Sequence, residues 1–371
     1  MFEAGSELKQ LLGAENVYDL SLGNPVIEPP AEFFSALQEL SQTTQKGLHR
    51  YMPNAGFDDV RETIAKDLNN KQLLTTTKKH ITMCVGAGGG LNVILKALLN
   101  QGDEVIVLAP YFVEYLFYIK NNGGQAVTVN TDCSFDLDIS AIAEALNKKT
   151  RAILICSPNN PTGTIYSKEK IASLHDLLHQ HNKKIDQPIM LISDEPYREL
   201  YYGTDPLPST VYNYPHSAIV YSWSKSLSIP GERIGYIALS ENVGDERLSE
   251  AIIFCTRILG FVNAPATMQL IVKNLISCTA PVEHYRKLRD KLYKGLEQLG
   301  FECIQPMGAF YVFPKIPDNY TDDIAFVTAA QQQAVLLVPG SGFGWPGNFR
   351  ISYAVDEWVV DGALKKMSLL L

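Results

Sequence analysis

The sequence lacks the patterns that mark several classes of protein. Its six cysteines (Cys84, Cys133, Cys156, Cys255, Cys278 and Cys303) are widely separated and form no Cys-x-x-Cys pair. This spacing predicts reduced, inert thiols rather than a disulfide framework or a thiol metal site. The histidines form no His-Glu-x-x-His pattern, and we expect the group His175, His179 and His181 to be a polar surface helix face rather than a metal site.

Long apolar runs and blocks of positive charge are also lacking. The formal net charge is −8 with no Lys/Arg block, which argues against a nucleic-acid partner. Apolar stretches such as 104–109 and 152–156 have the length of strands, whereas a membrane span needs about 18 residues. The opening "MFEAGSELKQLL" is amphipathic and does not resemble a signal peptide. We therefore expect a cytoplasmic protein with no membrane partner.

The pattern from about residue 55 to 240 is typical of an α/β domain. Short, continuous apolar runs alternate with helical patterns, as expected for a mostly parallel sheet with helices on both faces. The runs are 80–85, 104–109, 125–129, 151–156, 189–193, 218–222 and 234–239. The helical patterns are 57–70, 89–100, 111–122, 138–148 and 167–184.

After about residue 245 the pattern changes to that of a smaller α+β domain. Helical stretches at 245–260 and 264–298, interrupted near Pro281, precede short apolar runs at 308–316, 334–340 and 349–355, and a closing helix begins at Asp356. With 371 residues the chain is long enough for two domains. We expect 33–275 to form the large domain, and 1–32 with 276–371 to form the small one.

Residues that follow the strands are the candidates for a site, because ligands of such sheets bind at the carboxyl ends of the strands. "GAGGG" follows run 80–85, but Leu91 stands where a dinucleotide fingerprint needs a third small residue. The glycines would then open a helix whose N-terminus holds an anion, or serve a tight turn alone. "SPNNPTG" after run 151–156 offers Asn160, either as a hydrogen-bonding group or in an Asx turn.

The next two strand ends carry a carboxylate and an amine. Asp194 ends run 189–193 with Tyr197 close by, and it would be either a buried structural residue or a functional one. Lys225 lies in "SWSK" with Arg233 beyond it, which suits a solvated lysine, a phosphate-binding lysine or a nucleophile toward carbonyls. An anion cradle, a buried carboxylate with a phenol, and such a lysine together match the needs of pyridoxal phosphate.

The chain resembles the class I/II aminotransferases of the fold-type-I pyridoxal-phosphate enzymes. The resemblance runs from "SLGNPVIEPP" to "GSGFGWPGNFRISYA" and includes "NNPTG", "SDEPY" and "SWSK" in that order. It implies a seven-stranded sheet, a small domain built from both chain ends, and a homodimer with active sites at the interface. It also implies that the amino group of an L-amino acid passes to a 2-oxo acid, such as 2-oxoglutarate or pyruvate, by a ping-pong mechanism.

The resemblance assigns roles residue by residue. Lys225 resembles the lysine that forms the Schiff base and then shuttles a proton, Asp194 the partner of the pyridine nitrogen, and Tyr197 a donor to the phenolic oxygen. The other cofactor-binding residues that it implies are Ala87, Gly88, Phe112, Asn160, Ser222, Ser224, Arg233 and, reaching the partner subunit's site, Tyr51. The implied substrate-binding residues are Gly23, Asn160 and Arg350.

Some features leave alternatives open. Trp223 stands where relatives more often have a smaller side chain, and we expect it to point away from the cofactor. Arg257 is one residue away from the position of the arginine that binds a dicarboxylate side chain in aspartate-specific relatives, so the amino donor is not defined.

Whether an N-terminal arm is missing also stays open. A carbon–sulfur β-lyase would use the same lysine and aspartate, and a non-catalytic ligand sensor on this fold is a remote alternative.

Overall fold

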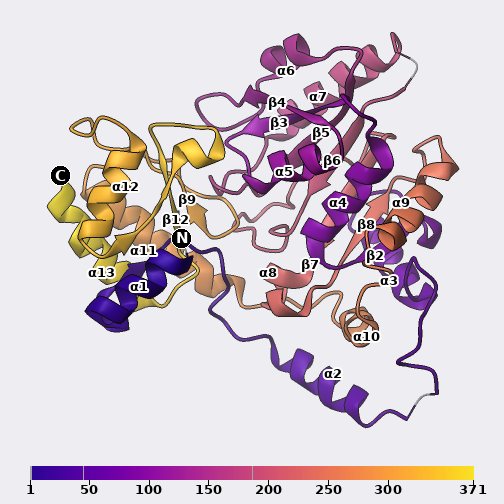
Figure 1. Ribbon diagram of the computed structural model, residues 1–371, viewed down its shortest axis with the longest axis horizontal. Coiled ribbons are helices and arrows are strands. Elements are labelled where there is room, and N and C mark those ends of the chain that lie inside the picture. The colour runs from indigo at the N-terminus through magenta and orange to yellow at the C-terminus, as the bar shows by residue number, and fades with distance from the viewer. Residues whose placement is uncertain (1, 45, 186) are drawn as a thin grey trace.

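A seven-stranded sheet forms the centre of the larger part of the molecule (Figure 1). The computed structural model describes residues 2–44, 46–185 and 187–371. The strand order is β2-β8-β7-β6-β5-β3-β4, where β8 is antiparallel to both neighbours and the other pairs are parallel. The strands are β2 Ile81–Cys84, β3 Glu104–Ala109, β4 Gln125–Asn130, β5 Thr150–Cys156, β6 Met190–Asp194, β7 Ser217–Ser222 and β8 Gly235–Leu239. All seven predicted strands, and the mostly parallel sheet, are confirmed.

Helices cover both faces of this sheet because its strands are apolar on both sides. Within β5, Ile153 and Ile155 join one hydrophobic core, while Ala152 and Leu154 join the other, as the two-residue period of a strand requires. The first core lies under α3 Asp58–Asn70, α6 Ile139–Ala145, α7 Lys168–Asn182 and α10 Ala266–Asn274. The second lies under α4 Gly86–Leu98, α5 Glu114–Asn121 and α9 Glu246–Ile258.

The histidine group on α7 corrects one expectation. His175 is buried rather than on a surface face, because it turns into the first core and stacks on Tyr214 with ring centroids 5.7 Å apart. Its Nε2 lies 2.9 Å from the backbone oxygen of Thr210. His179 is exposed, as expected. Within the described ranges, no group of three or more His, Cys, Asp or Glu side chains is placed to hold a metal ion.

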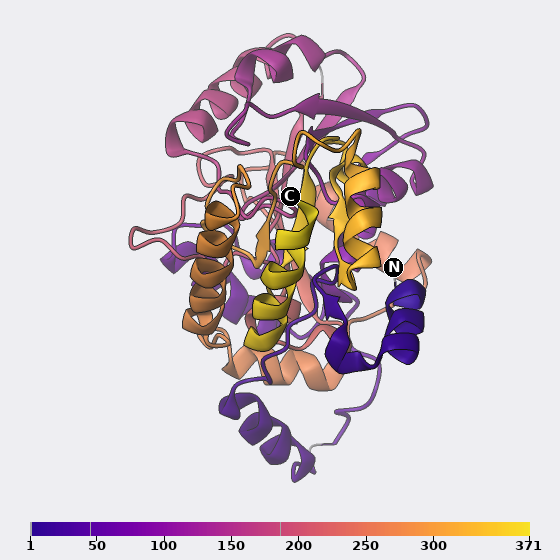
Figure 2. The ribbon, with the colours of Figure 1, turned by 90° about the vertical axis from the view of Figure 1, so that its left-hand side faces the viewer.

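The smaller part contains residues from both ends of the chain. Strand β1 Tyr18–Asp19 pairs in parallel with β10 Val335–Leu336. A second sheet has the order β11-β12-β9, from Val338–Pro339, Phe349–Ser352 and Tyr311–Val312. Around these sheets lie α1 Phe2–Leu12, α11 Val282–Gln298, α12 Asp323–Gln332 and α13 Glu357–Met367, and Figure 2 shows α13 between α11 and α12.

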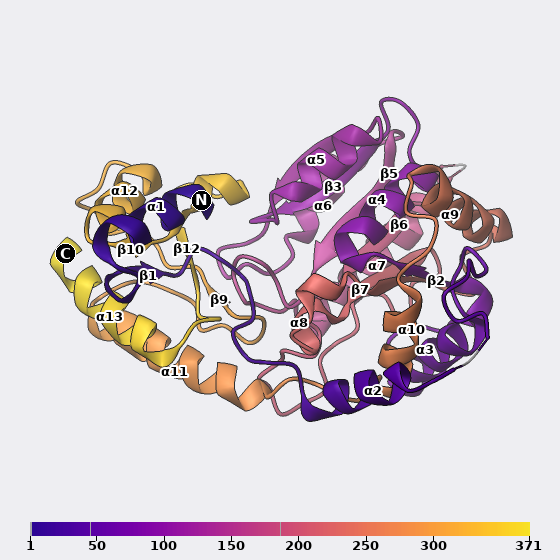
Figure 3. The ribbon, with the colours of Figure 1, turned by 60° about the horizontal axis from the view of Figure 1, so that its bottom comes forward.

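Several elements here differ from the predictions. The apolar run 334–340 splits into β10 and β11, because its two halves pair with different strands on either side of Leu337. Run 308–316 contributes only β9 to a sheet, and α12 was not expected. The unexpected helix α2 Ala31–Ser41 packs against α10 (Figure 3). In the ranges that the structure covers, no helix is both long and apolar enough to cross a membrane.

Trp223 provides a test of how the core supports the end of β7. Its side chain is 2% exposed, and its ring lies 5.3 Å from that of Tyr221 and 5.4 Å from that of Tyr236. We expect Trp223→Ala to lower the free energy of unfolding by about 3–5 kcal/mol, because a large cavity replaces the indole ring. Urea unfolding followed by circular dichroism measures this, and Trp223→Phe should cost less. A loss below about 1 kcal/mol for the alanine variant would contradict the packing role.

Candidate active site

Lys225 lies in the short helix α8 Trp223–Ser226, directly after β7. The Ser222 side chain caps this helix by accepting a hydrogen bond from the Ser224 N–H at 3.2 Å. The Lys225 Nζ donates to the backbone oxygen of Gly23 at 2.6 Å. Burial, together with the nearby charges of Arg233 and Arg350, lowers the pKa of Lys225 from its ordinary 10.5 to about 8. The neutral form of this amine is therefore far more populated near neutral pH than it is in an exposed lysine.

Asp194 ends β6 at the same edge of the sheet. Its Oδ2 accepts a hydrogen bond from the Tyr115 hydroxyl at 2.6 Å, whereas its Oδ1 is buried and has no partner in the described chain. Burial raises the pKa of Asp194 from its ordinary 3.8 to about 7, against the lowering effect of the Tyr115 hydrogen bond. A buried acceptor without a donor is costly in an isolated chain. The oxygen therefore suits a ligand that brings a positively charged N–H.

The N-terminus of α4 forms an anion cradle next to Arg233. The glycine-rich segment is the first turn of this helix rather than a turn before it, so Ala87 and Gly88 present unpaired backbone N–H groups. Gly86 has a φ of 77°, and a Cβ there would lie 2.7 Å from the Arg233 guanidinium. That guanidinium is exposed and donates to the backbone oxygens of Val85 and Pro230.

Two serine hydroxyls complete the cradle. Ser222 Oγ and Ser224 Oγ are buried and lie 2.7 Å apart. Ser222 pairs with Gly235 in the β7–β8 register, and a Cβ on Gly235 would lie 3.1 Å from the Gly86 Cα. This close approach joins the serines to the start of α4. Backbone N–H groups, hydroxyls and a guanidinium are the donors that a phosphate needs.

Arg350 joins three segments that are distant in the sequence. From β12, it donates to Asn160 Oδ1 at 3.0 Å and to the backbone oxygen of Ser21 at 2.6 Å. Its guanidinium lies 4.6 Å from the Tyr311 ring centroid and 4.9 Å from that of Phe343. The side chain is 7% exposed and its Nε has no partner in the described chain. A fixed, buried guanidinium of this kind can bind a carboxylate.

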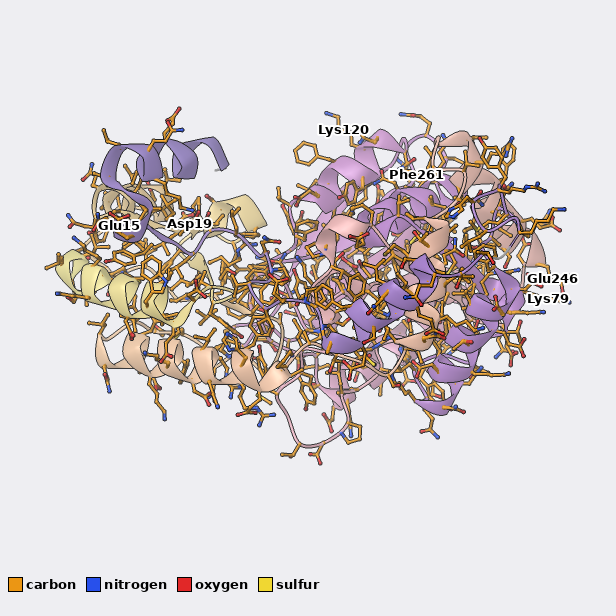
Figure 4. The ribbon with its side chains drawn as sticks, turned by 90° about the horizontal axis from the view of Figure 1, so that it is seen from below. Glu15, Asp19, Lys79, Lys120, Glu246 and Phe261 are labelled. Carbon is orange, nitrogen blue, oxygen red and sulfur yellow. The ribbon has the colours of Figure 1, made fainter. Side chains whose placement is uncertain are left out.

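The remaining expected residues lie around these groups, with one exception. Tyr197 and Tyr311 have hydroxyls 2.9 Å apart. Gly23 has no room for a side chain, because a Cβ would overlap the Tyr311 hydroxyl. Phe112 packs edge-on against Tyr115, with ring centroids 5.4 Å apart. Tyr51 is the exception, since it is 91% exposed and lines a surface pocket together with Phe261, which Figure 4 labels.

Three residues of the site were missed by the sequence prediction. Tyr115 and Glu114 both stand in "PYFVEY", directly after β3, and their position after a strand was the available signal. Tyr311 lies in an apolar run, where nothing distinguishes a site residue from a core residue. Arg257, whose role was not defined by the sequence prediction, is exposed in the last turn of α9.

The chain belongs to the aminotransferase class I and II family, whose model matches residues 15–367. It is 29% identical to an aspartate aminotransferase from Bacillus subtilis, over 98% of this chain and 93% of that protein. It is 29% identical to an aspartate/prephenate aminotransferase from Thermus thermophilus, over 95% of this chain and 90% of the relative. An amino transferase crystal structure from Eubacterium rectale is 38% identical, with a TM-score of 0.95 over 100% of this chain and 93% of that one. The protein is thus an aminotransferase.

The buried carboxylate of Asp194 makes a testable contribution to stability. Between pH 4 and about 7 the folded chain retains a proton that the unfolded chain has released, so stability falls as pH rises through this window. Asp194→Asn removes the titration. In cofactor-free protein, the stability of this variant relative to the wild type should increase by on the order of 2–3 kcal/mol between pH 5 and pH 8. Urea unfolding at both pH values measures the difference, and an unchanged difference would contradict the raised pKa.

Proposed function

We propose that the protein is a pyridoxal-phosphate-dependent aminotransferase that moves the α-amino group of an L-amino acid to a 2-oxo acid by a ping-pong mechanism. The observation that carries the proposal is the unpartnered, buried Oδ1 of Asp194, at the same sheet edge as the partly neutral amine of Lys225. The acceptor, 2-oxoglutarate or pyruvate, belongs to the proposal. The names of the relatives, aspartate and aspartate/prephenate aminotransferase, leave the donor undefined.

Each part of the cofactor has residues that would hold it. The phosphate would bind the N–H groups of Ala87 and Gly88, the hydroxyls of Ser222 and Ser224, and Arg233. The ring nitrogen would donate to Asp194, Phe112 would lie on the ring face, and Tyr197 and Asn160 would donate to the phenolic oxygen. The Lys225 amine would attach covalently to the aldehyde carbon. When bound, the cofactor supplies an electron sink for the electron pair that stays on Cα after deprotonation.

The chain's own groups bind the substrate and move its proton. Arg350, Asn160 and the backbone of Gly23 would hold the α-carboxylate, which fixes the Cα–H bond relative to Lys225. The Lys225 amine would take the Cα proton and would deliver it to the C4′ carbon of the cofactor. This role requires a neutral amine, and the lowered pKa of Lys225, about 8, makes that form accessible near neutral pH. Pairing with a protonated ring nitrogen would favour the carboxylate form of Asp194, because a neighbouring cation lowers the pKa of an acid.

A second copy of the chain would complete the site. Tyr51 is 91% exposed in the single chain, and we propose that it reaches the phosphate in the partner's site of a homodimer. We further propose a large domain of 33–275 and a small domain of 1–32 with 276–371. The pairing of β1 with β10 supports that division. A cytoplasmic location belongs to the same proposal.

Cofactor attachment and amino transfer together test the proposed function. Protein loaded with pyridoxal phosphate should show the cofactor's visible absorbance, and borohydride should fix the cofactor to Lys225 in a peptide identified by mass spectrometry. Amino-acid addition should shift the absorbance without 2-oxo acid, as expected for a ping-pong half-reaction. Lys225→Ala should lose both, because the amine supplies attachment and proton transfer, whereas the matched variant of exposed Lys120, Lys120→Ala, should retain both.

Two outcomes would contradict this function. A borohydride-fixed cofactor in Lys225→Ala would place the attachment elsewhere. Release of pyruvate and ammonia from a cysteine conjugate, with no amino transfer to any 2-oxo acid, would identify the β-lyase instead.

A further inference from the structure

Glu114 is a charged residue next to the site for which the proposed function has no use. It is the first residue of α5. This helix lies in the larger part of the molecule, on the side that faces β9 and β12 (Figure 1). Its Oε2 is buried from water and has no hydrogen-bond partner in the described chain. Burial raises the pKa of Glu114 above its ordinary value. A carboxylate oxygen that is hidden from water and unpaired needs an explanation.

The neighbours of Glu114 in the chain are tied to both halves of the site. Three residues before it, the Tyr111 N–H donates to the backbone oxygen of Phe343 at 3.1 Å, and the Phe343 ring contacts the Arg350 guanidinium. One residue after it, Tyr115 donates to Asp194. The segment that carries Glu114 is therefore anchored on one side beside Arg350, which would bind the substrate carboxylate, and on the other to Asp194, which would bind the cofactor ring.

Electrostatic effects place the Glu114 carboxylate near the same groups. The charge of Arg350 lowers the pKa of Glu114, while the charge of Glu114 raises the pKa values of Tyr311 and Tyr118. Tyr118 points toward the start of α4, since its hydroxyl lies 3.1 Å from where a Gly88 Cβ would be. The negative charge of Glu114 thus acts on Tyr311, which lies beside Arg350, and on Tyr118, which lies beside the start of α4.

Helix capping alone does not account for this carboxylate. A glutamate in the first turn of a helix is stabilised by the helix dipole, and a hydrogen bond from its own backbone N–H lowers the pKa of Glu114. That hydrogen bond leaves Oε2 without a partner. The other charged residue of α5, Lys120, is exposed and points away from the molecule (Figure 4). The charge of Arg350 favours the ionised form of Glu114 but does not supply a hydrogen bond to Oε2.

We propose that Glu114 faces the substrate side chain and makes this aminotransferase select amino acids whose side chains carry no negative charge. The inference rests on the proposed function, because it takes Arg350 as the group that binds the α-carboxylate. A substrate fixed there brings its side chain into the space that Glu114 borders. A side-chain carboxylate would then meet a like charge in a partly buried setting, whereas a neutral amide could donate to the free Oε2.

Matched amide and acid substrates test the selectivity directly. The half-reaction of the loaded enzyme should proceed with a kcat/KM at least tenfold higher for glutamine than for glutamate, and for asparagine than for aspartate. In Glu114→Gln these ratios should fall tenfold or more, because the like charge is removed while the size of the side chain is kept. The exposed Glu144 provides the matched control, and Glu144→Gln should leave the ratios unchanged.

Equilibrium binding separates this inference from the proposed function. Calorimetric titration of the holoenzyme with succinate and with its monoamide, neither of which carries an amino group, should show weaker binding of succinate in the wild type and a smaller difference in Glu114→Gln. Glu114→Ala serves as a second variant if the glutamine variant has a lowered melting temperature. A wild-type preference for glutamate and succinate, or ratios that Glu114→Gln does not change, would overturn the inference. Failure of every amino acid to react, with the binding difference intact, would instead count against the proposed function alone.

Discussion

Burial of the Asp194 carboxylate at the carboxyl end of β6 is the constraint on which the site depends. Parallel pairing of β5, β6 and β7 brings their carboxyl ends to one edge, and the apolar sheet around them removes water. The cost of that burial is offset only in part by Tyr115, which leaves one oxygen for a donor from outside the chain. The chain therefore contains a destabilising, unpaired carboxylate oxygen at the place where a protonated ring nitrogen would donate to it. Such a loss of stability in favour of function is common in proteins.

The same desolvation acts on Lys225 with the opposite chemical result. A buried carboxylate becomes a weaker acid and a buried amine becomes a weaker base, so one environment prepares both a partner for a cation and a neutral nucleophile. Arg350 then connects β12 with Asn160 and Ser21, three segments separated by more than a hundred residues each.

Much of this arrangement could be predicted from the sequence, for physical reasons. Continuous apolar runs define the seven central strands, and the residues after those strands must meet at one edge, which made Asp194 and Lys225 identifiable. The short strands of the smaller part were harder, because Val335–Leu336 and Val338–Pro339 belong to one apolar run but pair with different strands. Tyr115 and Glu114 were missed although they follow a strand, because the direction in which α5 turns each side chain decides whether it faces the site, and "PYFVEY" does not specify that direction.

The protonation state of the cofactor's ring nitrogen tests the central claim most directly. The enzyme loaded with pyridoxal phosphate labelled with ¹⁵N in the ring can be examined by ¹⁵N NMR at pH 8. The account predicts a protonated ring nitrogen in the wild type and an unprotonated one in Asp194→Ala, since the buried carboxylate is the group that holds the proton there. An unprotonated nitrogen in the wild type, or a protonated one in the variant, would contradict it.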